Sequence, residues 1–164
     1  MTDELPRIDS VSVTGPLTVS VTWKSGGTAQ INLAGWIATG GDLLAALNTG
    51  SLFGSAHAAE YGTSIAWGED DELMIDAEHL RLLAEEQAPI DISEWQAQAR
   101  LSNQEAAELL GVSLSTWNAY KAAKTGKTPK LVDIALRAAL RDPLIMQAHF
   151  RPRKAGRPRK DAAA

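Results

Sequence analysis

Cysteine is absent from the 164-residue sequence. A chain without cysteine forms no disulfide, no thiolate zinc site and no thiol nucleophile. This absence excludes zinc fingers and cysteine-dependent catalysis. It also favours a cytoplasmic location, where thiols stay reduced and disulfides are rare.

Long apolar runs and clustered histidines are missing as well. No run of about 18 apolar residues occurs, and residues 1–10 are acidic without an apolar segment. We therefore expect neither secretion nor membrane insertion. The three histidines, His57, His79 and His149, stand apart with no ligand spacing, so we expect no metal ion and no cofactor.

Basic residues are scarce in the first hundred positions and abundant afterwards. Residues 1–100 hold four lysines and arginines against fifteen aspartates and glutamates, whereas residues 101–164 hold twelve against five. The net charges are −11 and +7. Because phosphate is repelled by the first part and attracted by the second, only the C-terminal part is expected to approach a nucleic acid. A chance asymmetry between two solvated surfaces is the alternative.

Alternating apolar and polar residues near the N-terminus predict short strands over residues 8–13, 17–23 and 28–33. Glycines between the last two of these predict a hairpin. Beyond them we expect a short helix over residues 41–47 capped by Asp42, strands over 55–60, 64–67 and 73–75, and a helix from Asp76 to about Gln87. Residues 1–87 are thus predicted to form a small α+β domain, an antiparallel sheet with one or two short helices.

This region also resembles a short bacterial domain family of unknown function. The resemblance lies in the opening Pro6-Arg7-Ile8, the strand hairpin, and Trp67 followed by an acidic turn and Ile75-Asp76. Members of that family are sometimes fused to a helix-turn-helix and sometimes encoded beside a small toxin-like protein. The resemblance implies a regulatory or antitoxin-like setting, with a small protein partner for the N-terminal domain, and supplies no catalytic residue.

Residues 88–91 form the expected joint, and residues 92–150 carry a helical pattern. Ser93 is expected to cap a first helix that runs to Arg100. Ser102 and Glu105 have the spacing of a capping box at the start of a second helix. Gly111 follows where that helix must end.

A third helix, capped by Ser113, is expected to direct Val112, Trp117 and Tyr120 inward. Its exposed side is predicted to enter the DNA major groove. The candidates for contact with base edges are Leu114, Ser115, Asn118 and Ala119.

The run from Leu101 to Ser113 resembles the phage-repressor (Xre-like) helix-turn-helix family. The resemblance continues into a fourth helix, where Thr128 is the expected cap and Pro129 lies in the first turn. Apolar residues of this helix fall at helical spacing at Leu131, Ile134, Ala135 and Ala138. An all-α domain of four to five helices is therefore predicted, acting on double-stranded DNA as a homodimer.

Polar and basic residues at the edge of this module are candidates for phosphate contact. Asn103 stands where the family often has a phosphate-binding glutamine, and the lysines follow the third helix. The candidates are Asn103, Lys121, Lys124, Lys127 and Lys130.

The tail, residues 151–164, holds six positive charges in the ten residues from Arg151 to Lys160. We expect it to be disordered in the free protein. Gly156, Arg157, Pro158 and Arg159 resemble the core of an AT-hook, which implies that Arg157, Pro158 and Arg159 enter an A·T-rich minor groove. A nonspecific basic anchor is the alternative.

Catalysis is not predicted, because no nucleophile, base and orienting group can be assembled from these spacings. The acidic run Asp70-Asp71-Glu72 is interpreted as a solvated turn. The sequence therefore favours a DNA-binding regulator or antitoxin-like autoregulator. The alternative is a protein-interaction module, a toxin-neutralising or assembly partner, whose helix-turn-helix does not read DNA.

Overall fold

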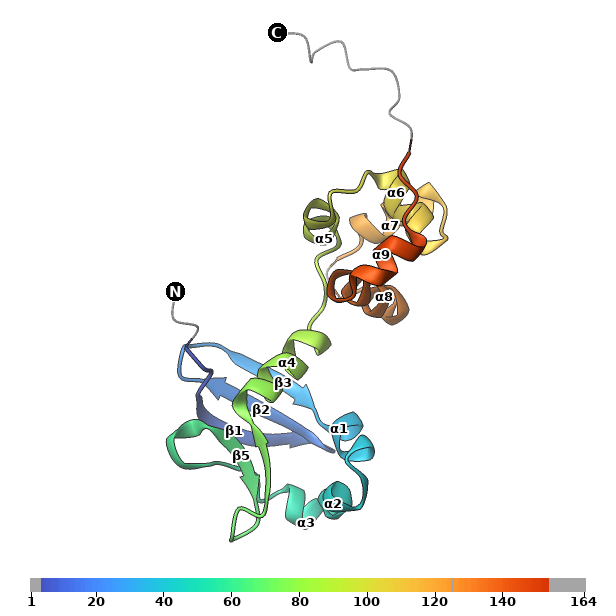
Figure 1. Ribbon diagram of the computed structural model, residues 1–164. Helices are drawn as coiled ribbons and strands as arrows, with labels where there is room; N and C mark the ends of the chain where they lie inside the picture. Colours follow the sequence, from blue (N-terminus) through green and yellow to red (C-terminus); the bar gives the residue numbers. More distant parts are fainter. Residues whose placement is uncertain (1–3, 125, 154–164) are drawn as a thin grey trace. The chain divides into compact units, whose positions relative to one another are not determined.

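The computed structural model describes residues 4–124 and 126–153. The chain divides into two compact units, Met1–Ala88 and Pro89–Ala164 (Figure 1). Each unit has its own hydrophobic core. The fold is an α+β unit followed by an all-α helix-turn-helix unit, as predicted from the sequence.

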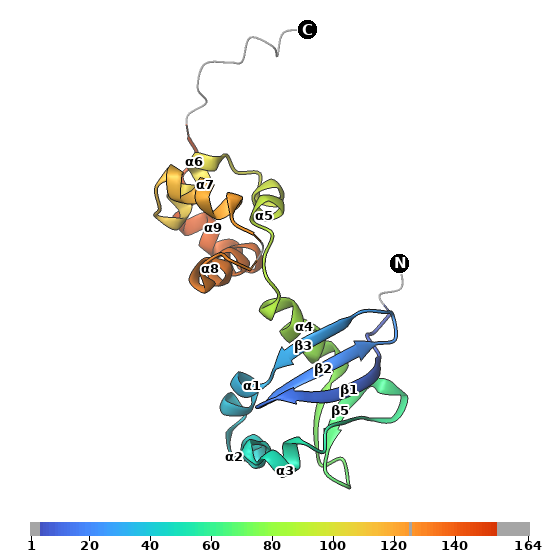
Figure 2. The ribbon, with the colours of Figure 1, turned by 180° about the vertical axis from the view of Figure 1, so that it is seen from behind.

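Two three-stranded antiparallel sheets build the described part of the N-terminal unit. The first has the order β1 (Ile8–Gly15), β2 (Thr18–Trp23) and β3 (Thr28–Asn32), and the second has β4 (His57–Ala58), β5 (Ser64–Trp67) and β6 (Leu73–Asp76). The helical segments are α1 (Ala34–Thr39), α2 (Gly41–Ala45), α3 (Gly50–Phe53) and α4 (Ala77–Gln87), with short 3-10 turns at Ala46–Asn48 and Glu60–Gly62. Helices α1 to α3 gather at one end of the first sheet in both ribbon views (Figures 1 and 2).

The alternation seen in the sequence sets the pairing of the strands. Val19 pairs with Val13 on one side and with Ile31 on the other, so apolar side chains line one face of the first sheet. In the second sheet Ile65 pairs with Ile75. Strand β1 contacts β4 and β5, and both sheets contribute to one core together with Leu80 of α4.

Gly62, in the 3-10 turn before β5, lies close against β1. Its φ is +69°, and a Cβ atom built on it would lie 2.1 Å from the carbonyl oxygen of Ile8. Only a residue without a side chain fits both the left-handed backbone and this contact. The approach holds the loop before β5 against β1.

Local details of the N-terminal unit confirm some predictions and correct others. The hairpin of β2 and β3 and the cap of α4 by Asp76, which accepts the N–H of His79 at 2.8 Å, are confirmed. The predicted cap by Asp42 is wrong: α2 begins after Gly40 with no side-chain cap, and Asp42 lies inside its first turn. The strand predicted over residues 55–60 is reduced to β4, since Glu60 already begins a 3-10 turn.

Five helices form the described part of the C-terminal unit: α5 (Ile92–Ala99), α6 (Asn103–Leu110), α7 (Leu114–Ala122), α8 (Lys130–Arg141) and α9 (Pro143–His149). Two tryptophans lie at its centre, Trp95 of α5 at 2% exposure and Trp117 of α7 at 0%. Their rings meet edge to face, with centroids 6.0 Å apart.

Hydrogen bonds from both indoles tie the helices together. Trp95 donates through Nε1 to the carbonyl oxygen of Leu136 in α8 at 2.8 Å. Trp117 donates through Nε1 to Gln96 of α5 at 3.2 Å, and Gln96 in turn donates to the carbonyl oxygen of Leu101 at 2.9 Å. The position of α7 is therefore fixed from α5 by both packing and hydrogen bonding.

Helix caps in the C-terminal unit differ from the sequence predictions at two helices. Asp91, not Ser93, caps α5 by accepting the N–H of Glu94 at 2.9 Å. Helix α8 begins at Lys130 after Pro129, with no side-chain cap from Thr128. Both errors displace a helix start by one or two residues.

The buried face of α8 is also different from the predicted one. Val132, Leu136 and Ala139 are buried, whereas Leu131 is 77% exposed and Ile134 is 55% exposed. Both sets have helical spacing, so periodicity alone does not distinguish them. Helix α8 consequently carries an exposed apolar stripe beside its buried face.

Candidate nucleic-acid interface

Helices α6 and α7 are joined by a tight turn whose ends are fully capped. Ser102 and Glu105 form the predicted capping box at the start of α6. Gly111 has a φ of +69°, and its N–H bonds to the carbonyl of Glu108 while that of Val112 bonds to Ala107. This pair of bonds is a Schellman motif, which ends α6 and turns the chain.

Ser113 then starts α7 as predicted, accepting the N–H of Thr116 at 3.1 Å. Trp117 faces the core, so the opposite side of α7 faces solvent. All four predicted base-contact residues of α7 are exposed and form a row along the helix: Leu114, Ser115, Asn118 and Ala119.

The two polar side chains of this row, those of Ser115 and Asn118, differ in whether they already form hydrogen bonds within the protein. The hydroxyl of Ser115 lies 3.0 Å from that of Ser113 and belongs to the cap of α7. Asn118 makes no side-chain hydrogen bond to any described residue. The free polar group of the row is therefore the amide of Asn118.

Two of the predicted phosphate-contact residues come together in the structure. Lys121 of α7 donates through Nζ to Oδ1 of Asn103, the first residue of α6, at 2.9 Å. Lys124, Lys127 and Lys130 are exposed in the loop after α7 and at the start of α8. Within residues 4–124 and 126–153, none of these lysines forms an ion pair.

Of the basic tail, only the first three residues are described. Arg151 and Arg153 are exposed. The predicted minor-groove residues Arg157, Pro158 and Arg159 lie outside the described residues.

Three side-chain contacts of importance to this unit were not predicted from the sequence. Gln96 links α5 to Trp117, Asp91 caps α5, and Glu105 bonds to the backbone of Arg153 as well as to the capping box. Asp91 could have been found from its spacing to Glu94. The other two contacts join residues 21 and 48 positions apart, which no local pattern indicates.

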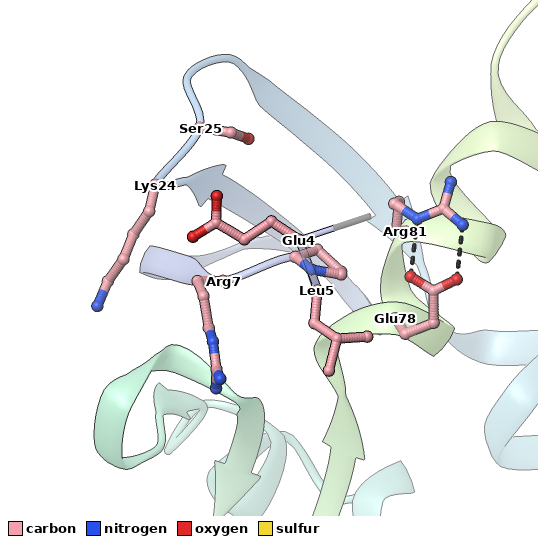
Figure 3. A pocket seen from close by; sticks show the side chains of 8 residues that line it. Glu4, Leu5, Arg7, Lys24, Ser25, Glu78 and Arg81 are labelled. Carbon is pink, nitrogen blue, oxygen red and sulfur yellow. Dashed lines mark hydrogen bonds and ion pairs between the residues drawn. The ribbon is translucent and has the colours of Figure 1, made fainter. Parts of the chain in front are cut away.

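The N-terminal unit contains a hollow of about 520 Å³ lined by its three basic residues, Arg7, Lys24 and Arg81. Arg81 is held by Glu78, with Nε and Nη2 donating to the carboxylate at 2.8 and 2.6 Å, and also by Glu85. Arg81 lowers the pKa of Glu78. The cationic groups of Arg7 and Lys24 point away from Arg81 (Figure 3). The three cationic groups therefore do not converge on one point at which an anion could bind.

His57 and Asp71 form the contact closest to catalytic chemistry. Nε2 of His57 lies 2.8 Å from Asp71, and Nδ1 lies 3.0 Å from the carbonyl oxygen of Ser55. The Ser55 carbonyl and then Asp71 raise the pKa of His57. Through these two contacts His57 joins the chain before β4 to the β5–β6 turn.

Two further surveys cover the described residues. No group of three or more histidine, aspartate or glutamate side chains among them has the arrangement of a metal site. None of the helices in residues 4–124 and 126–153 is long and apolar enough to cross a membrane.

No protein-family model and no curated protein sequence matches the chain. Among solved structures, the chain is similar to a Nitrosomonas europaea protein whose name proposes DNA binding, over 93% of this chain and 96% of that one. The sequence identity is 23% and the TM-score is 0.44. At these values the likeness assigns no function, and the case for DNA binding depends on the residues of the chain itself.

Proposed function

We propose that the chain is a DNA-binding protein whose C-terminal unit holds duplex DNA. The observation that carries this proposal is the capped α6–turn–α7 pair, with Trp117 buried and the row Leu114 to Ala119 exposed. Helix α7 enters the major groove along that row. The lysines after it meet the phosphates on the edge of the groove.

Affinity comes mainly from charge in this proposal. Residues 101–164 carry twelve basic against five acidic residues, and four of the five candidate phosphate-contact residues are lysines. The row on α7 offers one free amide and two apolar side chains, Leu114 and Ala119. Sequence discrimination by α7 is therefore modest, and the tail adds contact with an A·T-rich minor groove beside the site.

Binding to short duplexes at several salt concentrations tests the proposal. Fluorescence anisotropy with the full chain is expected to show binding at about 50 mM salt that weakens steeply as salt rises. A chain that is folded and shows no binding at about 50 mM salt contradicts DNA binding. That outcome favours the alternative, a protein-interaction module.

Replacing Asn118 by alanine tests the contact with bases. An asparagine amide binds adenine through two hydrogen bonds, a contact of about 1–3 kcal/mol in discrimination. N118A is expected to lose preference at one base pair while keeping the same dependence on salt. Competition between a preferred duplex and single-base variants measures this, and Gln98→Ala, on the exposed side of α5, is the matched control.

The division of the chain into two compact units supports a further proposal, a regulatory role. We propose that the chain is a cytoplasmic transcriptional regulator, or an antitoxin-like autoregulator, that performs no catalysis. The C-terminal unit resembles phage repressors in the residues 101–113. The acidic N-terminal unit is then free to bind a small protein partner while the basic unit holds DNA.

Self-association of the C-terminal unit accounts for the exposed stripe on α8. Leu131 and Ile134 are exposed while Ala135 and Ala138 are half-buried beside them. We propose that a second copy covers this stripe in a homodimer. Leu131→Lys with Ile134→Lys is expected to give a monomer in sedimentation velocity, whereas Leu43→Lys in the N-terminal unit is expected to leave the dimer intact. A monomeric native chain at micromolar concentration contradicts the dimer.

A further inference from the structure

Strand β3 is an outer strand of the first sheet, whose order is β1, β2 and β3 (Figure 2). In an antiparallel ladder, the backbone N–H and C=O groups of successive residues point alternately toward the paired strand and away from it. The N–H of Leu33, directly after β3, bonds to the carbonyl oxygen of Leu17, directly before β2, at 2.7 Å. Counting back from Leu33 along the unbroken register, the backbone groups of three residues of β3 point outward: Asn32, Gln30 and Thr28.

An amide already occupies one of these three positions. Gln87 is the last residue of α4, and its side chain meets the backbone of Asn32. The N–H of Asn32 donates to Oε1 of Gln87 at 2.9 Å, and Nε2 of Gln87 donates to the carbonyl oxygen of Asn32 at 2.8 Å. A residue of an added antiparallel strand makes the same two bonds with its own backbone groups. The side chain of Gln87 therefore stands in for a peptide group at the end of β3.

The other two outward positions, Thr28 and Gln30, are open. Both residues are exposed, and among residues 4–124 and 126–153 their outward backbone groups have no hydrogen-bond partner. Natural sheet edges are commonly protected from pairing by charged side chains, proline or a bulge. The sequence of β3, Thr-Ala-Gln-Ile-Asn, has no charged residue and no proline, and its register with β2 is unbroken. The edge of β3 therefore offers hydrogen-bonding groups to a further strand and lacks these protections.

Charge decides which kind of strand fits this edge. Residues 1–88 hold thirteen acidic against three basic residues, a net charge of −10. A second copy of the chain brings the same negative charge to the edge and is repelled, whereas a basic segment is attracted. Pairing through backbone groups also requires the segment to be extended. The occupant that fits is a basic, extended segment of another protein.

We propose that β3 binds such a segment as an added strand, through the backbone groups of Gln30 and Thr28, with Gln87 closing the site at Asn32. The inference rests on the protein partner proposed for the N-terminal unit and deepens it, since it names the binding surface and the chemistry of the partner. It does not depend on DNA binding. Affinity comes from the backbone hydrogen bonds and from the opposite charges of the segment and the unit.

Amide hydrogen exchange of the full chain, followed by NMR, tests the edge without any substitution. In the free chain the N–H of Gln30 is expected to exchange fast, whereas the N–H groups of Ala29 and Ile31, which point toward β2, are protected. The probe is the peptide Lys-Val-Lys-Val-Lys-Val, which is basic and carries strand-forming valines. At saturating peptide, exchange at Gln30 is expected to slow by at least about ten-fold. The control peptide Lys-Pro-Lys-Pro-Lys-Pro has the same charge but lacks half of the N–H groups of a strand, and it should leave the rate unchanged.

Gln30→Pro removes the outward N–H from β3. Proline is tolerated at an edge position whose N–H faces solvent, so the ladder with β2 is retained. Gln30→Ala is the matched control, because it removes the same side chain and keeps the N–H. In anisotropy titrations with the labelled Lys-Val peptide, Q30P is expected to bind roughly ten-fold more weakly than Q30A, which should match the native chain. Circular dichroism checks that Q30P is folded, and if it is not, the exchange measurement decides alone.

Three results each overturn the inference. They are slow exchange at Gln30 in the free chain, no slowing there when the Lys-Val peptide is added to the folded native chain, and equal affinity of folded Q30P and Q30A for that peptide. Titration of the same preparations with a duplex measures DNA binding separately, and Q30P is expected to bind DNA like the native chain. A failure at the edge of β3 is therefore distinguishable from a failure of the proposed DNA binding.

Discussion

Replacing Trp117 by alanine is expected to unfold the C-terminal unit while the N-terminal unit stays folded. Trp117 is fully buried, packs against Trp95 and bonds to Gln96. Removal of a buried tryptophan side chain costs about 3–5 kcal/mol in the free energy of unfolding. The free energy of unfolding of a small domain is little more than about 5 kcal/mol. The substitution therefore removes most of the stability of the C-terminal unit.

Calorimetry measures this result, because two units with separate cores are expected to give two unfolding transitions. W117A should retain only the transition of the N-terminal unit, and its binding to DNA should disappear. Trp117→Phe is the control, since it keeps an aromatic ring in the core. A W117A chain with both transitions intact would show that Trp117 does not hold α7 in place.

The second large effect is expected from the four lysines that follow the exposed row of α7. Each phosphate contact adds about 0.9 to the negative slope of log affinity against log salt concentration. Lys121, Lys124, Lys127 and Lys130 together supply up to about 3.6 of that slope if all four bind phosphate. Their contribution corresponds to a roughly 150-fold loss of affinity between 50 and 200 mM salt.

Substitution of all four lysines by glutamine should therefore flatten the salt dependence by that amount and weaken binding at low salt. Anisotropy titrations at four or five salt concentrations measure the slope. Lys24→Gln, in the N-terminal unit, is the control for a lysine outside the interface. An unchanged slope in the fourfold variant would mean that these lysines do not contact DNA.

Short-range features of this chain were predictable because they depend on residues three or four positions apart. The Ser102–Glu105 capping box, the glycine end of α6 at Gly111 and the Ser113 cap of α7 are all of this kind. In each, one side chain or one backbone conformation satisfies polar groups in the adjacent turn. These features define the α6–α7 pair, so the frame of the candidate interface was accessible from sequence.

The face of α8 was not predictable in the same way. Leu131, Ile134 and Ala138 have the same helical spacing as Val132, Leu136 and Ala139, and either set could form the buried stripe. The choice is made by packing with other helices, including the bond from Trp95 to the carbonyl oxygen of Leu136.

Contacts between residues far apart in the chain were missed for a related reason. The pairing of Lys121 with Asn103 spans 18 positions, and that of Glu105 with Arg153 spans 48. The sequence identifies these four residues only as basic, polar or capping side chains and does not indicate which of them meet. Both contacts are made at the first turn of α6, and both are set by tertiary structure.

Mapping of backbone amide shifts by NMR on the full chain with a short duplex at low salt tests the central claim most directly. The account predicts shifts at the start of α6, along the exposed side of α7, in the loop that carries Lys124 and Lys127, and at the end of α9 where the tail begins. The amides of β1 to β6 should be unaffected. Shifts confined to the N-terminal unit, or none at all under conditions where both units are folded, would contradict it.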